Sequence, residues 1–554
     1  MADVFSNYHP GVAFDEMVDA AGTIRPSYKA VHTSLQAATA DDLRGIAESL
    51  ASSYTQAGVT FDVGGVERPF PLDLVPRVIA AAEWETIESG VAQRVRALEA
   101  FLADVYSDGR VIADGVIPRQ LISSSTHYHR AVWGAQPANG VRVHVAGVDL
   151  IRTPEGDVRV LEDNVRVPSG VSYVMTNRSA MVNALPDAFS NQRIRSVGGY
   201  SQRLLTALRK AAPPGVDDPT VVVLTPGVYN SAYFEHSLLA RTMGVELVEG
   251  RDLECRRGRV FMRTTAGLRR VDVIYRRIDD EFIDPVHFRS DSMLGVPGLV
   301  NAVRCGGVAL ANAIGNGVAD DKLVYTYVPD LIRYYLHAEP IIANIDTWRL
   351  EEPEALEEVL DRLHELVVKP VDGSGGKGIV IGPRASLSEL EALRRRVIQD
   401  PRGWIAQPLV QLSTVPTLID DKLAPRHVDL RPFAVNNGED IWVLPGGLTR
   451  VALPEGELVV NSSQGGGSKD TWVLSPPLNR PITITDPEPE PEPEPAVPLQ
   501  DVQDQPPPRP RPTAVPLGVS RPLGSRPQAV RVMSDRGSRR EQQEQQQQSG
   551  GLPC

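Results

Sequence analysis

Cysteine is scarce in this chain of 554 residues, which holds only Cys255, Cys305 and Cys554. An odd number of widely separated cysteines provides no disulfide framework, and their spacing matches no metal-ligand motif. A reducing cytoplasm is the simplest setting for such a chain. No apolar run approaches the roughly 18 residues that a membrane helix needs, and the first residues lack the pattern of a signal peptide. We therefore expect a cytoplasmic protein without a transmembrane segment.

Positive charge is also in short supply, because 57 Lys and Arg residues stand against 70 Asp and Glu residues and the net charge is −13. A chain with this balance is a poor general binder of nucleic acid, whose phosphates attract basic surfaces. We therefore expect no nucleic-acid partner. An anionic small molecule remains compatible, since a local group of Lys and Arg can dominate one cleft. The length allows several domains and a large core.

The last part of the chain has a composition unlike the rest. From about residue 475 it is rich in proline, with Pro–Glu repeats at 487–495 and glutamines at 542–548. Such a segment has too little apolar surface to offset the entropy of the unfolded chain. We expect a disordered tail over 475–554, which is either a solvated extension or a docking segment for a protein partner that recognises proline.

The strongest local signal is the run from Leu366 to Ile381. Two β-branched stretches flank a glycine-rich loop, and Lys369 and Lys377 lie on its two sides. Glycine lets backbone N–H groups approach an anion closely, and a nearby lysine adds charge. A plain hairpin needs about two turn residues, so the pattern favours phosphate binding over a simple turn. Because the second flank continues as a strand, the loop is neither a P-loop nor a Rossmann fingerprint.

A second signal is a hairpin of two strands, 142–151 and 158–162, joined by a turn at 153–157. It brings Asp149 towards Glu162 and Asn164, and the latter two share a strand face because side chains alternate with period two. Three oxygen donors that converge from adjacent strands predict a Mg²⁺ site. The alternative is a polar turn beside a salt bridge.

Further along, the pattern of residues 220–249 predicts a β-α-β unit in a parallel sheet. Tyr229–His236 lies at its strand-to-helix turn, where open α/β sheets bind ligands. The strand 271–280 ends in Arg276 and Arg277, and a guanidinium fork suits a carboxylate or a phosphate. The alternatives are aromatic packing at the turn and pairing of the arginines with Asp279 and Asp280.

Local patterns also predict two helices and several later strands. Apolar residues three or four apart predict a helix over 84–106. Ser386 and Glu389 form a capping box for a helix that ends near residue 398. Strands are expected at 404–410, which contains Gln407, and at 427–435, which contains Arg431. This part is therefore α+β, with strands on both sides of the glycine loop.

Taken together, two lysines before a glycine loop, a hydrogen-bonding strand after it and an Asp–Glu–Asn set are the parts of a Mg-ATP phosphoryl-transfer site. At this point the chain resembles a known family over about residues 13–474. It looks like the circularly permuted ATP-grasp proteins of the second type, related to the ATP-grasp half of glutathionylspermidine synthetase. The resemblance is carried by five blocks in one order: Leu161–Gly170, Tyr275–Asp279, Asn312–Lys322, Val368–Gly378 and Asn461–Asp470.

The resemblance implies roles for individual residues. The implied Mg²⁺ ligands are Asp149, Glu162 and Asn164. The implied ATP contacts are Lys322, Lys369, Ser374, Gly375, Gly376 and Gln407. Arg431 most resembles the basic residue near the phosphates. One position departs from the relative, because its catalytic arginine, two positions before the first metal ligand, is replaced by Gly147; Arg276 or Arg277 supplies the charge instead, or the chemistry differs.

The implied architecture is a circularly permuted ATP-grasp fold with α/β and α+β parts, a Rossmann-like pre-ATP-grasp subdomain and a disordered tail. Permutation accounts for the order, since the metal carboxylates precede the lysines and chain termini often lie close together. The expected parts are an N-terminal α+β region with the carboxylate hairpin, a pre-ATP-grasp-like subdomain, a nucleotide-binding subdomain and the tail, at 1–218, 219–320, 321–474 and 475–554.

The reaction implied by the family is activation of a carboxylate as an acyl phosphate, followed by attack of an amine. We therefore expect an ATP- and Mg²⁺-dependent carboxylate–amine ligase that acts on small-molecule or peptide acids and amines. No protein nucleophile is needed, in line with the absence of a convincing Ser/His/Asp or Cys/His set. The alternative is an ATP-binding scaffold or regulatory protein, weak or inactive as a catalyst, that acts through its proline-rich tail.

Overall fold

The computed structural model describes residues 4–5, 8–63, 66–371, 378–457, 460, 466–476 and 532–549. The chain divides into two compact units, one of Met1–Ser475 with Ser538–Cys554 and one of Pro476–Gly537. The predicted boundaries after residues 218 and 320 lie inside the first unit, and they stay predictions. Among the described helices, none combines the length and apolar character needed to span a membrane.

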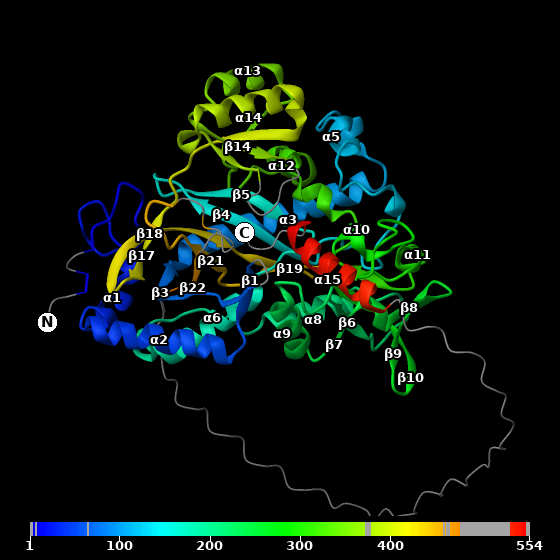
Figure 1. The fold of residues 1–554 in the computed structure, drawn as a ribbon, viewed down its shortest axis with the longest axis horizontal. Coiled ribbons are helices and arrows are strands. Elements are labelled where there is room, and N and C mark those ends of the chain that lie inside the picture. The colour runs from blue at the N-terminus through cyan, green and yellow to red at the C-terminus, as the bar shows by residue number, and fades with distance from the viewer. Residues whose placement is uncertain are drawn as a thin grey trace, which may run out of the picture. The chain divides into compact units, whose positions relative to one another are not determined.

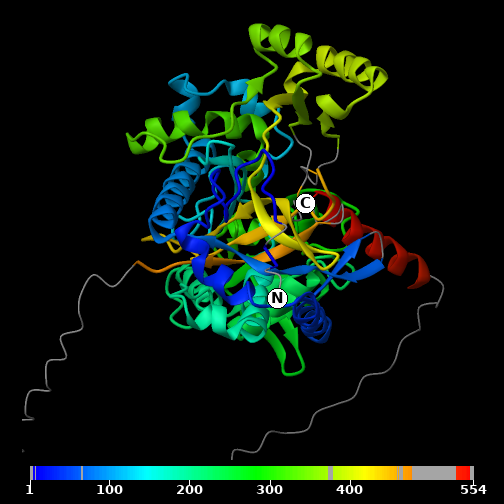
Figure 2. The same ribbon diagram turned by 90° about the vertical axis from the view of Figure 1, so that its left-hand side faces the viewer.

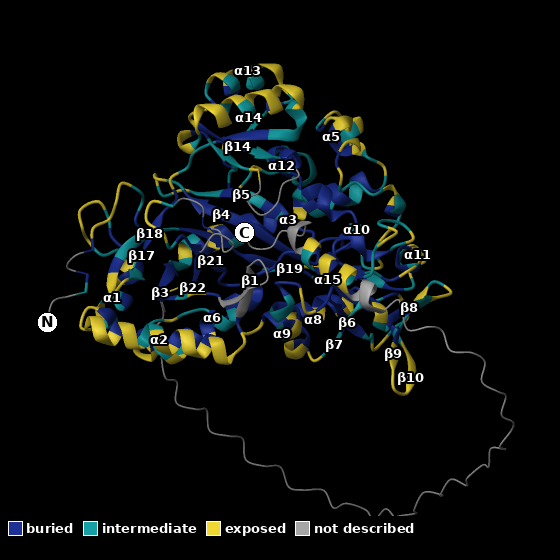
Figure 3. Cartoon of the chain, viewed as in Figure 1, coloured by how far each residue is buried: buried dark blue, intermediate teal, exposed yellow. Residues whose placement is uncertain are grey.

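A nine-stranded sheet forms the centre of the first unit (Figure 1). Its strand order is β20-β19-β4-β18-β21-β22-β3, with β17 paired to β18 and β5 paired to β4. Most of its strands are buried, as expected of a sheet that is covered on both faces (Figure 3). The strands are β3 (Leu72–Ile79), β4 (Val145–Arg152), β5 (Val158–Asn164), β17 (Thr414–Ile419), β18 (Lys422–Arg431), β19 (Phe433–Asn436), β20 (Ile441–Val443), β21 (Leu448–Val451) and β22 (Gly467–Val473).

A four-stranded parallel sheet has the order β12-β11-β6-β7. Its strands are β6 (Val221–Leu224), β7 (Glu246–Val248), β11 (Val273–Arg276) and β12 (Ala309–Ala311), and α9 (Tyr233–Met243) connects the first two. The predicted β-α-β unit at 220–249 is therefore confirmed. An antiparallel sheet of β8 (Leu253–Arg256), β9 (Arg259–Thr264) and β10 (Gly267–Val271) follows β7.

A smaller sheet carries the flanks of the glycine loop. Its order is β13-β16-β14-β15, with β13 (Trp348–Arg349), β14 (Leu366–Pro370), β15 (Val380–Ile381) and β16 (Trp404–Pro408). Helices α13 (Pro353–Asp361) and α14 (Leu387–Gln399) pack on it around a small apolar core that includes Val359, Val368 and Leu393. Figures 1 and 2 show this sheet and its helices projecting from the rest of the first unit. The predicted capping box of Ser386 and Glu389 begins α14.

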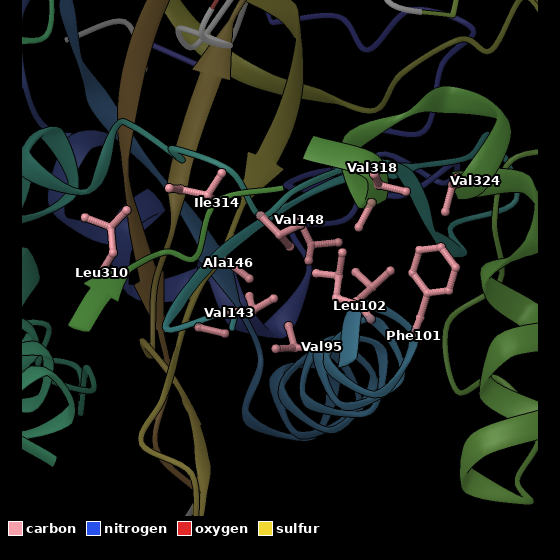
Figure 4. Packing of buried hydrophobic residues seen from close by; sticks show 14 of the residues in the cluster. Val95, Phe101, Leu102, Val143, Ala146, Val148, Leu310, Ile314, Val318 and Val324 are labelled. Carbon is pink, nitrogen blue, oxygen red and sulfur yellow. The ribbon is translucent and has the colours of Figure 1, made fainter. Parts of the chain in front are cut away.

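The long helix α3 (Ala81–Val105) confirms the predicted helix at 84–106. Its apolar stripe packs against β4, the segment after β12 and α12 (Lys322–Leu336) in one buried cluster. Figure 4 shows Phe101 and Leu102 of α3 beside Val148, Val318 and Val324. Because Asp149 follows Val148 and Lys322 begins α12, this cluster fixes two of the predicted site residues to the same core.

The remaining elements of the first unit surround these sheets. They are α1 (Lys29–Leu35), α2 (Ala40–Gln56), β1 (Thr60–Val63), β2 (Val66–Pro69), α4 (Arg110–Ala113), α5 (Arg119–Ser123), α6 (Val171–Ala184), α7 (Pro186–Ser190), α8 (Tyr200–Lys210), α10 (Asp280–Ile283) and α11 (Leu299–Arg304), with short 3-10 turns between them. Within the segment that the sequence predicts to be a disordered tail, the structure adds helix α15 (Val532–Ser549). Its residues from Ser538 onward belong to the first unit.

Candidate active site

The predicted carboxylate hairpin is present as the antiparallel pair β4–β5. Asp149 lies opposite Glu162, and Gly147 lies opposite Asn164. The register shifts between Asp149 and Leu150, so the hairpin carries a bulge at the carboxylate. Bulges of this kind re-aim side chains and are common beside active sites. The structure thus brings the three predicted oxygen donors to neighbouring positions at one end of the hairpin.

Asp149 is fully buried between two arginines from neighbouring strands. Arg431 of β18 donates to both oxygens of Asp149, and Arg450 of β21 donates to Oδ2 at 2.8 Å. Arg450 also pairs with Asp429, which lies opposite it in the sheet. Burial alone would raise the pKa of Asp149, but the two arginines outweigh it and hold the pKa well below its usual range. Asp149 is therefore an anion whose position is fixed from two sides.

Glu162 and Asn164 are less constrained than Asp149. The Glu162 side chain is 37% exposed, and Arg431 Nη2 lies 3.7 Å from its Oε1. The Asn164 Nδ2 is buried and has no hydrogen-bond partner among the described residues. An unpaired buried amide is costly, so this end of the hairpin has a hydrogen-bond donor that the described part of the chain does not use. A ligand with its own polar groups would satisfy that donor.

Two lysines face the hairpin from other elements. Lys369 at the end of β14 donates to Oε1 of Gln407 at 2.6 Å, across the β14–β16 pair. Burial lowers the pKa of Lys369 to about 8; nearby Glu162 opposes the shift and nearby Lys322 adds to it. Lys322 is the first residue of α12. Because the charges of Glu162 and Lys322 both act on Lys369, three separate segments lie close together here.

Gln407 links the two sides of this cluster. Its side chain is buried, accepts from Lys369 and donates through Nε2 to the Thr347 hydroxyl at 2.9 Å. Both ends of the carboxamide are thereby oriented. Ser374, Gly375 and Gly376 of the predicted flap lie outside the described residues; β14 and β15 on either side pair antiparallel, which confirms the predicted strand–loop–strand pattern.

Asp320 is a member of this cluster that sequence reasoning missed. Burial raises its pKa to about 7, the Arg166 guanidinium opposes that shift, and the charges of Asp163 and Glu162 add to it. Its Oδ1 accepts from the backbone N–H of Val165 at 2.7 Å. Asp320 lies in the block Asn312–Lys322 that carries the family resemblance, which is the signal that could have identified it.

The two arginines at the end of β11 have different surroundings. Arg276 donates to the carbonyls of Asn312, Ile278 and Ala313 and pairs with Asp280 at 2.8 Å, so its guanidinium is committed to the fold. Arg277 donates to the Ser169 hydroxyl at 2.6 Å and to Glu235 at 2.9 Å.

Glu235, at the start of α9, also accepts from the backbone N–H groups of Gly170 and Ser172. It lies in the predicted ligand-binding turn Tyr229–His236. Arg431 Nη1 reaches the carbonyl of Ser169 at 3.4 Å, so Ser169 lies between Arg277 and Arg431. Arg277 is thereby joined to the hairpin cluster.

The structure gives a steric reason for the glycine at position 147. A Cβ at this position would lie 3.2 Å from Cδ of Arg431 and 3.3 Å from Cβ of Pro168. Any side chain at 147 would therefore compete with the Arg431 stem for the same space. The absence of a side chain at position 147 leaves room for the Arg431 side chain, which extends from β18 towards the site.

The donor set suits Mg²⁺ held together with a nucleotide. Among the described residues, no three His, Cys, Asp or Glu side chains are arranged to hold a metal by themselves. Mg²⁺ in nucleotide sites is commonly held by one or two carboxylates plus phosphate oxygens and waters. The Glu162 carboxylate and the Asn164 amide, beside the two lysines, provide the one or two protein ligands that such a site needs.

Comparisons with known proteins agree with this geometry. Residues 76–452 match the family model described as circularly permuted ATP-grasp type 2. An uncharacterized protein of Mycobacterium tuberculosis is 61% identical over 477 residues, which are 85% of this chain and 87% of that protein. An uncharacterized protein of Synechocystis is 51% identical over 472 residues, which are 84% of this chain and 98% of that protein.

A Frankia casuarinae protein provisionally named glutamate–cysteine ligase 2-2 is 45% identical over 474 residues; these are 85% of this chain but 54% of that protein, so the chain spans about half of it. A solved structure of a glutathione synthetase-like effector from Globodera pallida, in the apo form, superposes with a TM-score of 0.52 at 10% identity. The superposition covers 79% of this chain and 98% of the effector, and it shows a shared fold.

Proposed function

Since the chain belongs to the circularly permuted ATP-grasp type 2 family, we propose that it is an ATP- and Mg²⁺-dependent carboxylate–amine ligase that forms a peptide or amide bond. The family and the ligase-named relative support an ATP-dependent ligase in general. The observation that carries the proposal is that the carboxylate hairpin meets the segment before Lys322 through the hydrogen bond from Val165 to Asp320 at 2.7 Å. Lys369, held by Gln407 at 2.6 Å, lies near enough to Glu162 and Lys322 for both to affect its pKa. Cations and oxygen donors at one place suit a phosphate chain and its metal.

In the proposed reaction, an oxygen of the acid attacks the γ-phosphorus and ADP leaves. The amine nitrogen then attacks the acyl carbon, the bond from that carbon to the phosphate oxygen breaks, and the amine loses a proton. Lys322 and Lys369 bind the phosphates, and Gln407 orients Lys369. Glu162 and Asn164, with Asp149 and Asp320 nearby, would hold Mg²⁺, and the ion would supply positive charge that offsets the charge of the phosphates. Ser374, Gly375 and Gly376 are proposed to cover the nucleotide.

The proposed arginine roles follow from their surroundings. Arg431 has its stem over Gly147 and its guanidinium between Asp149 and Glu162, so we assign it the positive charge beside the transferred phosphoryl group. Arg277 is held by Ser169 and Glu235, but its buried Nε has no hydrogen-bond partner among the described residues, so Arg277 is assigned to the acid substrate. Arg276 is assigned the support of that strand end, because its donors already have partners within the fold.

Glu162→Gln in the full chain tests the proposal. ADP release would be measured with mixed acids and amines. The mixtures include L-glutamate and L-cysteine, because these two amino acids appear in the name of the Frankia relative. We expect turnover and Mg²⁺-dependent ATP binding to fall at least about a hundredfold, a loss typical for a group that stabilises transferring charge. The matched control is Glu357→Gln, an exposed residue of α13. Normal ATP binding by the wild type without ADP release from any mixture would instead favour the scaffold alternative.

A further inference from the structure

Three glutamines of helix α15 are buried, which is unusual for this residue type. Gln542, Gln543 and Gln546 are 4%, 4% and 5% exposed. Their spacing of one and three residues puts them on one side of the helix, and all three belong to the first unit. A solvated glutamine tract would leave them in water, so the helix occupies a specific place on the body of the protein (Figure 1).

The glutamine side chains are bound by backbone groups of the body. Gln542 accepts from the N–H of Met293 and donates to the carbonyl of Asp291, each at 2.6 Å. Both the oxygen and the nitrogen of the Gln542 carboxamide are therefore hydrogen-bonded to the backbone. Gln543 accepts from the N–H of Tyr229 at 3.2 Å, and Gln546 donates to the carbonyl of Arg277 at 2.7 Å.

These partners lie in the segments that follow the carboxyl ends of strands in the parallel sheet. Tyr229 follows β6, and Arg277 follows β11, its neighbour in the sheet. From β6 the chain passes to β7 on one side, whereas β11 is followed by β12 on the other side. The crevice outside the carboxyl ends of β6 and β11 is thus a topological switch point, the place where open α/β sheets bind ligands. Helix α15 fills that crevice.

The fit extends beyond the hydrogen bonds. A Cβ at Gly227 would lie 2.5 Å from Nε2 of Gln543, so a side chain at position 227 would displace the Gln543 carboxamide from its observed place. Arg539 pairs with Glu249, which follows β7, and Arg540 lies over the ring of Tyr229 with Cζ 4.8 Å from its centroid. The helix therefore contacts the ends of three successive strands of the sheet order.

We propose that the backbone groups at this switch point, which we call the crevice, form a binding site for glutamine carboxamides and that the chain occupies it with the part of its own helix α15 from Ser538 onward. The helix competes there with the acid or amine substrate, a consequence that rests on the proposed ligase function. Arg277 connects the two sites, because its carbonyl binds Gln546 and its guanidinium binds Ser169 and Glu235 of the candidate active site. Displacement of the helix releases the ligase.

The first test measures docking without reference to catalysis. Hydrogen exchange of the full chain would be followed in peptides that span 226–233 and 289–296. In the triple variant Q542A/Q543A/Q546A we expect the amides of Tyr229 and Met293 to exchange about five- to tenfold faster, the factor that loss of one hydrogen bond implies. The matched control is Glu541→Ala, an exposed residue of the same helix. Equal exchange in the wild type and the triple variant would overturn the site.

The second test measures competition. A fluorescein-labelled peptide of residues 532–549 should bind the triple variant in an anisotropy titration, and the wild type should bind it more weakly because its own helix fills the crevice. With a productive acid and amine, ADP release by the triple variant should rise several-fold and fall again when the peptide is added. Faster exchange with unchanged turnover would overturn competition. Failure of all turnover would refute the ligase function, while the exchange and titration still decide the site.

Discussion

Replacing Lys369 with methionine should weaken nucleotide binding and yet stabilise the fold. The amine of Lys369 is held in a confined position beside Gln407, and burial lowers its pKa to about 8 from 10.5. Each pKa unit corresponds to about 1.4 kcal/mol, so the shift sets an upper limit of about 3 kcal/mol on the cost of holding the charge. The side chain keeps some exposure, and Gln407 would lose a donor. We therefore expect a net gain of about 1 kcal/mol in the free energy of unfolding.

The size of this gain in stability depends on pH. Below pH 8 the amine is charged in both the folded and the unfolded chain, so the full cost is present. Between pH 8 and 10.5 the folded chain loses the proton first, so the unfolded chain binds more protons and the stability of the wild type rises with pH. The advantage of Lys369→Met should therefore be largest near pH 7 and should vanish towards pH 10.5.

The assay compares urea unfolding of chelator-treated protein with calorimetric titration of Mg-ATP. Loss of a charged hydrogen bond to phosphate is worth about 1.5–3 kcal/mol, so ATP affinity should fall about 10- to 150-fold. The control is Lys422→Met, an exposed lysine on β18, for which stability should change by less than about 0.5 kcal/mol. A variant that is clearly less stable than the wild type at pH 7, or that binds ATP normally, would refute the reasoning.

Three further predictions concern other parts of the site and its support. Gln407→Leu should weaken ATP binding about tenfold, because the variant no longer orients Lys369 beside the phosphates; calorimetric titration with Mg-ATP measures the effect. Asp320→Asn should leave urea stability at pH 7 unchanged or higher, since burial and two neighbouring acids raise the pKa of Asp320 to about 7, while the affinity for Mg-ATP falls; intact affinity would remove Asp320 from the proposed metal surroundings. Glu16→Gln should cost about 3 kcal/mol at pH 7. Burial would raise the pKa of Glu16, but Arg77 and Arg152 lower it to about 2, so this contribution is present above pH 4.5 and is lost as the pH falls through about 2; urea unfolding at pH 7 and pH 3 measures it.

Much of the architecture follows from local sequence signals. The hairpin with Asp149 and Glu162 could be predicted because its turn and strand alternation are encoded within a short stretch. The strands on either side of the glycine loop and the helix after Ser386 have equally local causes. The family and its fold followed from motif blocks in a fixed order, and the comparisons confirm them.

Other features depend on partners far away in the chain. No local pattern marks Arg450 as the second partner of Asp149, because the two are 301 residues apart. Asp320 has a raised pKa because the fold buries it and brings it near Asp163 and Glu162. The glutamines of α15 read as solvated by composition, and only the backbone groups at Tyr229 and Met293 give them a site.

The strand order of the central sheet also determines when the sheet can assemble during synthesis of the chain. Asp149 leaves the ribosome 282 residues ahead of Arg431, and at a synthesis rate of about 5–20 residues per second this delay lasts roughly 15–60 s. Strand β3 likewise waits for β22, its neighbour among the described strands of the large sheet, which ends at Val473. During that interval the nascent chain carries an unneutralised carboxylate and an open strand edge next to its apolar core. The order in which this chain is synthesised therefore makes assembly of the sheet a late event, completed only when nearly all of the folded body has emerged.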